Sequence, residues 1–120
     1  MKIKNIKFKA KQLNSGKWFE GDLVRLGNRV CIGGDHIKDG ITDVDPSTVC
    51  MFTGLKDCEG KELFEHDLIH FVGFTHTAEV IWSEGNYAFM VVSENKHSYW
   101  LHNVIKVCRI ERIGNKFDKK

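Results

Sequence analysis

The sequence has little proline, few cysteines and no long apolar run. Its single proline, Pro46, argues against a disordered insert, and no apolar stretch approaches the roughly 18 to 20 residues that a membrane-spanning helix needs. The amino terminus, MKIKNIKFKAK, lacks the apolar core that a signal peptide carries. We therefore expect a cytoplasmic protein without membrane contact.

The four cysteines are widely spaced in a chain without a secretion signal, so a disulfide framework is not expected. Cys31, Cys50 and Cys108 stand among apolar neighbours and are predicted to be small core residues. Cys58 stands in a polar turn and is predicted to be exposed. We expect all four thiols to be reduced.

Motifs for catalysis and for metal binding are also missing. The sequence has no CxxC or HExxH spacing and no glycine-rich phosphate loop. His66 and His70 would share one face of a strand, with Asp67 on the other face. Cys58 with a distant histidine, or the carboxylates from Asp57 to Asp67, could be drawn as catalytic groups, but acids this dense in a turn are usually solvated. We therefore predict no enzyme activity, no metal site and no cofactor.

The residues that are present are typical of one globular domain. The chain has 120 residues, of which 42% are hydrophobic and 28% charged, so it can bury most of its apolar surface. Short apolar segments separated by turns predict a mainly β fold with little helix. We expect one domain over residues 1–120, with an amino-terminal β-hairpin and loop over residues 1–43 and a connection and small β-barrel over residues 44–120.

Two hairpins are expected. In the first, Ile6, Phe8 and Ala10 alternate with lysines, and a turn at residues 14–16 leads to a returning strand at residues 17–24. The alternating lysines predict that the first strand lies at a sheet edge. The second hairpin is the clearest, with strands at residues 78–82 and 87–92 around a turn. The sequence of strands and turns from residue 65 to residue 92 is typical of an SH3-like barrel.

The net charge of +2 hides a segregation of charge along the chain. Residues 1–34 carry eight bases and two acids, residues 35–84 three bases and eleven acids, and residues 85–120 seven bases and three acids. An acidic middle can neutralise the basic ends within a subunit or between subunits, which would remove the long-range field that nucleic-acid binding uses. Self-assembly into a homo-oligomer is therefore one candidate role.

Two charged surfaces are candidates for binding a partner. The acidic candidates, which would meet a basic partner or the basic ends of the chain, are Asp57, Glu59, Glu62 and Glu65. The basic candidates, which would bind nucleic acid with help from Tyr99 or Trp100, are Lys7, Lys9, Lys11, Arg109 and Arg112. Because edge protection explains the alternating lysines equally well, nucleic acid is the less favoured partner.

The most specific pattern lies between residues 44 and 69. The run Val44-Asp45-Pro46-Ser47-Thr48-Val49, followed by Thr53-Gly54-Leu55-Lys56-Asp57, Gly60-Lys61-Glu62 and Glu65-His66-Asp67, resembles the YopX family of phage and prophage proteins. The resemblance extends to residues 6–10, 18–23, 79–82 and 113–115. It implies a phage or prophage origin, a bacterial host cytoplasm and an SH3-like β component, and it implies no activity.

Two positions depart from the family pattern. Lys11-Gln12 stand where the family usually has Trp and Asp, and His66 stands where it usually has Gly. The histidine predicts that its turn does not need a positive φ. We therefore predict a small phage-encoded accessory protein of unknown activity, which acts as an adaptor by binding a phage or host protein.

Overall fold

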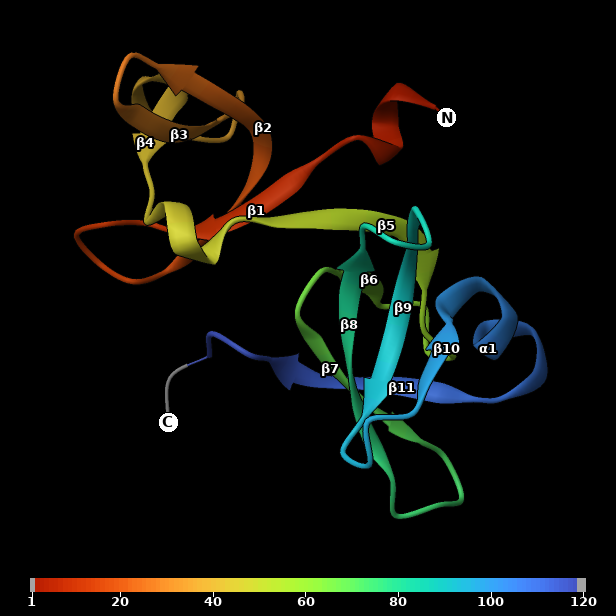
Figure 1. Cartoon of the computed structure of the whole chain (residues 1–120). Helices are drawn as coiled ribbons and strands as arrows, with labels where there is room; N and C mark the ends of the chain where they lie inside the picture. The colour runs from red at the N-terminus through yellow and green to blue at the C-terminus, as the bar shows by residue number, and fades with distance from the viewer. Residues whose placement is uncertain (1, 119–120) are drawn as a thin grey trace. The chain divides into compact units, whose positions relative to one another are not determined.

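The computed structural model describes residues 2–118, which form two compact units (Figure 1). The units meet in the sequence between Phe52 and Thr53, inside strand β5 (Cys50–Lys56). β5 is hydrogen-bonded to β1 (Phe8–Lys11) in the first unit and to β6 (Glu62–Phe64) in the second. The single domain over residues 1–120, divided after residue 43, stays a prediction.

The first unit is an antiparallel sheet in the order β4-β3-β2-β1-β5. Its other elements are η1 (Ile3–Asn5), β2 (Trp18–Leu26), β3 (Arg29–Gly33), η2 (Lys38–Gly40), β4 (Ile41–Asp43) and η3 (Pro46–Thr48). The small core consists of Ala10, Ile32, Ile37 and Val44, with partly buried apolar side chains packed against them. The predicted amino-terminal hairpin is confirmed, because β1 pairs with β2 around a turn in which Gly16 has φ +71°.

The prediction that the first strand is a sheet edge is wrong. β1 lies between β2 and β5, so that Lys9 is opposite Glu20 on one side and Cys50 on the other. The cause is the segment around η3, where the Asp45 carboxylate accepts a hydrogen bond from the Ser47 amide at 3.0 Å. After this capped turn the chain reverses its direction, and the following segment, β5, pairs with β1. Lys9 is consequently only 5% exposed.

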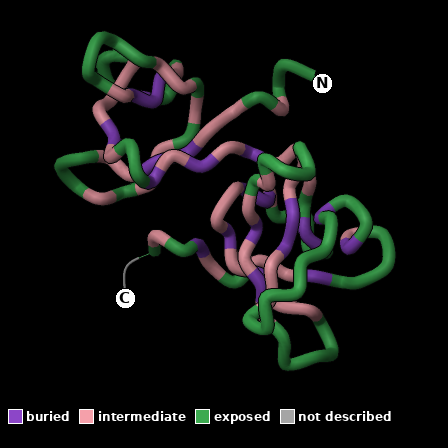
Figure 2. Tube along the Cα trace, in the orientation of Figure 1, coloured by how far each residue is buried: buried purple, intermediate pink, exposed green. Residues whose placement is uncertain are grey.

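The second unit contains a five-stranded antiparallel sheet in the order β10-β9-β8-β7-β11. Its elements are β7 (Asp67–Phe71), β8 (Thr77–Ser83), β9 (Ala88–Ser93), β10 (Ser98–Trp100), α1 (Leu101–Val107) and β11 (Ile110–Asn115). The core comprises Leu63, Ile69, Ala78, Val80, Val91, Leu101, Val104 and Ile110. In Figure 2 these buried segments alternate along the strands with half-buried ones.

The predicted second hairpin is confirmed, because β8 pairs with β9 from Ala78↔Ser93 to Ser83↔Ala88. The mainly β fold with little helix is also confirmed, and α1 is the one α-helix in residues 2–118. Strands β10 and β11 are the two ends of the five-stranded sheet, so strand pairing among the described residues does not close a barrel. No helix in this part of the chain has the length and apolar character needed to cross a membrane.

The prediction that the turn at His66 needs no positive φ is wrong, since His66 has φ +70°. The turn joins β6 to β7 within two residues, and both main-chain groups of His66 are used in it. Its amide donates to the Val80 carbonyl, and its carbonyl accepts from the Lys116 amide at 2.8 Å. The ring lies 2.9 Å (Nδ1) from Glu79 Oε2 and packs edge-on against Phe117. These contacts hold a histidine in a conformation that glycine adopts at lower cost.

Three of the four cysteines lie as predicted: Cys31 and Cys50 are buried and Cys58 is exposed. The prediction that Cys108 is a core residue is wrong, because its side chain is exposed. Cys108 is the residue at which α1 ends, and its amide donates to the Val104 carbonyl. The apolar neighbours in sequence therefore belong to a helix end rather than to a buried strand. None of these four cysteines, all of which lie within residues 2–118, forms a disulfide bond.

Candidate functional site

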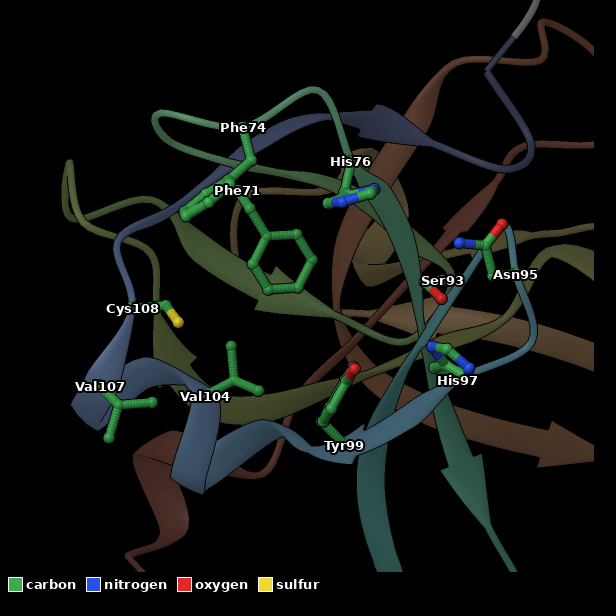
Figure 3. A pocket seen from close by; sticks show the side chains of 10 residues that line it. All are labelled: Phe71, Phe74, His76, Ser93, Asn95, His97, Tyr99, Val104, Val107 and Cys108. Carbon is green, nitrogen blue, oxygen red and sulfur yellow. The ribbon is translucent and has the colours of Figure 1, made fainter.

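The second unit contains an open groove of about 560 Å³. Segments far apart in the sequence form it: the end of β7 and the β7–β8 loop, the end of β9 and the β9–β10 loop, β10, and the end of α1. Figure 3 shows the side chains that line it, which are Phe71, Phe74, His76, Ser93, Asn95, His97, Tyr99, Val104, Val107 and Cys108. This hollow is called the aromatic groove below.

The aromatic groove combines a buried floor with exposed apolar walls. Val104 is buried in the core of the unit, and Phe71 packs against the same core. The side chains of Phe74, Tyr99 and Val107 are 63%, 48% and 80% exposed. An isolated exposed apolar side chain is ordinary, but three around one hollow that continues into the core are typical of a binding site.

The β7–β8 loop is held in place by His70, which lies just outside the groove. Its Nδ1 lies 3.0 Å from Glu111 Oε1 on β11, and its Nε2 lies 2.6 Å from the Phe74 carbonyl oxygen. Phe74 also donates its amide to the Phe71 carbonyl at 3.0 Å. The loop that carries Phe74 and His76 is therefore tied to a neighbouring strand, which limits how far the aromatic wall can move.

The opposite wall is a tight turn between β9 and β10. The Ser93 amide donates to the His97 carbonyl at 2.8 Å, and the Lys96 amide donates to the Ser93 carbonyl at 2.9 Å. Lys96 has φ +69°, which lets the chain reverse within this short turn. Ser93 Oγ is buried and has no hydrogen-bond partner within residues 2–118.

The charges next to the aromatic groove are mostly positive. Among residues 2–118 no carboxylate side chain lines it, and its lining includes two histidines. Lys96, Lys106 and Arg109 are each adjacent in sequence to a lining residue, and Glu94 is the one acid in such a position. The groove is therefore apolar at its centre and basic along its flanking segments.

The structure places Asp57 and Glu59 before β6, Glu62 at the start of β6 and Glu65 on the turn after it. Asp57 is 7% exposed, and its carboxylate accepts amide hydrogen bonds from Glu59 and Lys61 at Oδ1 and from Arg112 at Oδ2. Burial raises the pKa of this carboxyl, but the three amide hydrogen bonds lower it by more, so the pKa lies below its ordinary value. Asp57 thus joins this turn to β11.

The other three predicted acids are more accessible. Glu59 is exposed and lies 3.3 Å from the Lys61 ammonium, while Glu62 and Glu65 are half-buried. A Glu65 carboxylate oxygen lies 3.8 Å from His66 Nε2. The partner-binding role of Asp57, Glu59, Glu62 and Glu65 stays a prediction.

The predicted basic residues divide between the two units. In the first unit, the Lys7 ammonium lies 4.9 Å from the centroid of the Phe52 ring, and those of Lys9 and Lys11 lie 4.7 Å and 5.5 Å from the Trp18 ring. These lysines therefore cover aromatic faces. Such a contact is worth about 0.5–1 kcal/mol at an exposed site and about 2 kcal/mol when it is buried, as that of Lys9 is.

In the second unit, Arg109 is exposed, whereas Arg112 is partly buried. Arg112 Nε lies 3.2 Å from Oδ2 of Asp67, whose carboxylate is fully buried and also accepts from the Phe64 amide at 2.7 Å and the Asn115 side chain at 2.9 Å. Arg112 therefore compensates a buried charge. Nucleic-acid binding by Lys7, Lys9, Lys11, Arg109 and Arg112 stays a prediction.

Two observations concern the chemistry of the cysteines and of metal-binding side chains. Cys31 donates its thiol to Asp43 at 3.1 Å, and burial together with this hydrogen bond raises the pKa of the Cys31 thiol, which makes it a poor nucleophile. Residues 2–118 contain no group of three or more His, Cys, Asp or Glu side chains that could hold a metal ion. The chemistry that the aromatic groove supports is binding.

Sequence reasoning missed most of the aromatic groove. Among its lining residues it gave a binding role only to Tyr99, as an aid to nucleic-acid binding. A usable signal was present at Phe74, which stands in the polar turn Gly73-Phe74-Thr75-His76 where an apolar ring has no strand face to occupy. His97 and Val107 carry no such local signal. Their common location depends on how β9, β10 and α1 fold together.

Comparison with known proteins agrees with the pattern between residues 44 and 69. No curated protein matches the chain. The family model described as YopX protein matches residues 7–119, which is nearly the whole sequence. The chain therefore belongs to the YopX protein family.

Proposed function

We propose that this chain is a small, non-catalytic accessory protein, encoded by a phage or prophage and acting in the host cytoplasm, that binds another polypeptide through the aromatic groove. The observation that carries the proposal is the exposure of Phe74, Tyr99 and Val107 around a floor that continues into the core. Burying apolar surface is favourable by about 25 cal/mol per Å². A partner side chain that fills the groove would obtain this free energy.

The geometry of the walls supports binding as well. His70 ties the β7–β8 loop to β11, and the turn that begins at Ser93 is closed by two main-chain hydrogen bonds. A groove with fixed walls loses little conformational entropy when a partner binds. Aromatic side chains such as Phe74 and Tyr99 are also the kind that contribute most to binding at protein interfaces.

We also infer that the second unit has an SH3-like architecture. Strands β7, β8, β9 and β10 form a meander, and after the short helix α1 the chain returns as β11 to pair with β7. Small barrels of this kind place loops around one end, where they can surround a ligand. The fold does not settle the function, so the proposal depends on the aromatic groove itself.

The test is affinity capture from a lysate of the host cells in which the phage or prophage is active. We expect wild-type protein to enrich a specific polypeptide, and a variant with Phe74→Ala and Tyr99→Ala to retain less than about a tenth of it. Tyr87→Ala is the matched control, because Tyr87 is 80% exposed and does not line the groove. Equal capture by the groove variant, or turnover of a small substrate without any capture, would contradict the proposal.

A further inference from the structure

The exposed edge of β10 indicates the form that a partner takes in the aromatic groove. Within residues 2–118, β10 has one strand neighbour, β9, and forms one end of the five-stranded sheet. All three of its residues, Ser98, Tyr99 and Trp100, are exposed. An exposed strand edge is a template on which an extended peptide can add a further strand.

The register of β9 and β10 shows which main-chain groups are available at this edge. The Ser93 amide donates to the His97 carbonyl, so Ser93 and His97 are a hydrogen-bonded pair of the antiparallel ladder. Hydrogen-bonded pairs alternate with non-hydrogen-bonded ones, so the next such pair is Val91 and Tyr99. The main-chain amides of Ser98 and Trp100 therefore point away from β9, toward the open edge.

The same register places the side chains. His97 and Tyr99 lie two residues apart, so they share one face of β10, and both line the aromatic groove. A peptide paired with the edge of β10 would direct every second side chain to that face. A groove of about 560 Å³ has room for more than one such side chain.

The charged residues near the aromatic groove favour acidic over basic extended peptides. The segments that line the aromatic groove carry the three bases Lys96, Lys106 and Arg109 and the single acid Glu94, and two histidines line the groove itself. Acidic residues beside the apolar side chains of a peptide would therefore be attracted, and basic ones repelled.

We propose that the partner of the aromatic groove is an extended polypeptide segment that adds a strand to the edge of β10 and presents aromatic or aliphatic side chains at alternate positions, flanked by aspartate or glutamate. This inference rests on the proposed function and specifies its ligand. A second copy of the chain, or a single-stranded nucleic acid stacked on Phe74 and Tyr99, is a different occupant that the experiment below distinguishes.

The experiment is selection of a displayed library of random twelve-residue peptides on the full chain. We expect enriched peptides to carry apolar residues two apart with acids beside them. Their affinity should fall at least about tenfold for the Phe74→Ala and Tyr99→Ala variant. The affinity of the peptides should fall severalfold for the variant with Lys106→Glu and Arg109→Glu. It should stay unchanged for the control Lys116→Glu, because Lys116 is exposed and does not line the groove. Circular dichroism would verify that each variant folds.

N-methylation of one enriched peptide then tests strand addition. Alternate amides of an added strand point toward β10, so methylating one set of alternate positions should reduce affinity at least about tenfold, and methylating the other set should change it little. Equal effects of the two sets, or enrichment of basic instead of acidic peptides, would overturn this inference while leaving groove binding intact.

Other results would remove the proposed function together with the inference. One such result is that no enriched peptide depends on Phe74 and Tyr99 for its binding. A second is that the chain forms a dimer, and that the Phe74→Ala and Tyr99→Ala variant does not. A third is that the chain binds a labelled DNA or RNA oligonucleotide instead of peptides, and that the same variant loses this binding. Light scattering and fluorescence anisotropy on the same protein samples report these outcomes.

Discussion

The lysine-bearing strand of the first unit and the aromatic groove of the second unit use aromatic side chains in different ways. In the first unit, lysine ammonium groups lie over the rings of Phe52 and Trp18 at 4.7–5.5 Å from the ring centroids. In the second unit, Phe74 and Tyr99 project into the aromatic groove, and within residues 2–118 no cation lies over either ring. The same type of side chain therefore stabilises the fold in one unit and remains available to a partner in the other.

The units differ in the same way in their use of charge. The first unit places lysine ammonium groups over ring faces, whereas the second unit surrounds the carboxylates of Asp57 and Asp67 with amides that donate hydrogen bonds to them. Removing a buried charge that has several partners lowers the free energy of unfolding strongly, whereas removing an exposed contact between a cation and a ring lowers it little. The predictions below follow this difference from the largest effect to the smallest.

Removal of the most deeply buried carboxylate should have the largest effect. We expect Asp67→Ala to lower the free energy of unfolding by about 3–5 kcal/mol, because Arg112 would lose its ion-pair partner and the Phe64 amide its acceptor. Urea unfolding measures this loss. Glu94→Ala, a change at an exposed acid, is the control and should stay within about 0.5 kcal/mol of wild type. A loss below about 1 kcal/mol for Asp67→Ala would show that the buried network contributes little.

Asp57→Asn should have the next largest effect, a loss of about 1–3 kcal/mol at neutral pH, because an amide keeps only one of the two acceptor oxygens. The pKa of Asp57 is lower in the folded chain than in the unfolded chain. Its stabilising contribution is therefore complete above the unfolded pKa and disappears as the pH falls through the folded pKa.

Unfolding followed by urea at a series of acidic pH values checks this dependence. Wild type should lose stability more steeply on acidification than Asp57→Asn, in which this carboxyl is absent. Asp43, whose pKa is also lowered, by its hydrogen bonds to Cys31 and Arg29, is present in both proteins and cancels in the comparison. Parallel pH profiles for the two proteins would contradict the assignment.

At His66 the expected effect is about 1 kcal/mol. His66→Ala and His66→Gly both lose the contacts to Glu79 and Phe117, but only glycine adopts φ +70° without strain. The glycine variant should therefore be the more stable of the two by about 1 kcal/mol, measured by thermal and urea unfolding. An alanine variant as stable as the glycine variant would indicate that the turn adopts another conformation.

The smallest effect belongs to the surface of the first unit. A double-mutant cycle of Lys11→Met and Trp18→Leu should give a coupling free energy of about 0.5–1 kcal/mol, because the ammonium of half-buried Lys11 lies 5.5 Å from the ring centroid. The matched cycle in the second unit, Lys96→Met with Tyr99→Leu, should give a coupling near zero. Equal couplings in the two cycles would remove the contrast between the units.

The parts of this fold that sequence reasoning predicted are those with local causes. Alternation and turn residues predict both hairpins, and Asp45 before Pro46 predicts a capped turn that the structure shows. The position of β1 inside its sheet was not predictable in this way, because its second neighbour, β5, comes from a segment about forty residues later. Alternating lysines look the same whether they protect an edge or cover the ring of Trp18.

The candidate site escaped prediction for the same reason. Phe74, Tyr99 and Val107 come from three separate segments, and none of the segments has a binding motif. Their proximity follows from the pairing of β9 with β10 and from the place where α1 ends. At His66 the sequence signal was misleading, since a histidine in place of glycine suggested an ordinary backbone, and contacts made by the folded chain hold it at a positive φ instead.

The most direct test of the central claim is the dissociation constant of the captured polypeptide for three forms of the full chain. The account predicts that Phe74→Ala with Tyr99→Ala weakens binding at least about tenfold, while Trp18→Leu in the first unit leaves it unchanged. Loss of binding with Trp18→Leu, and undiminished binding by the groove variant, would contradict the account and place the interaction in the first unit.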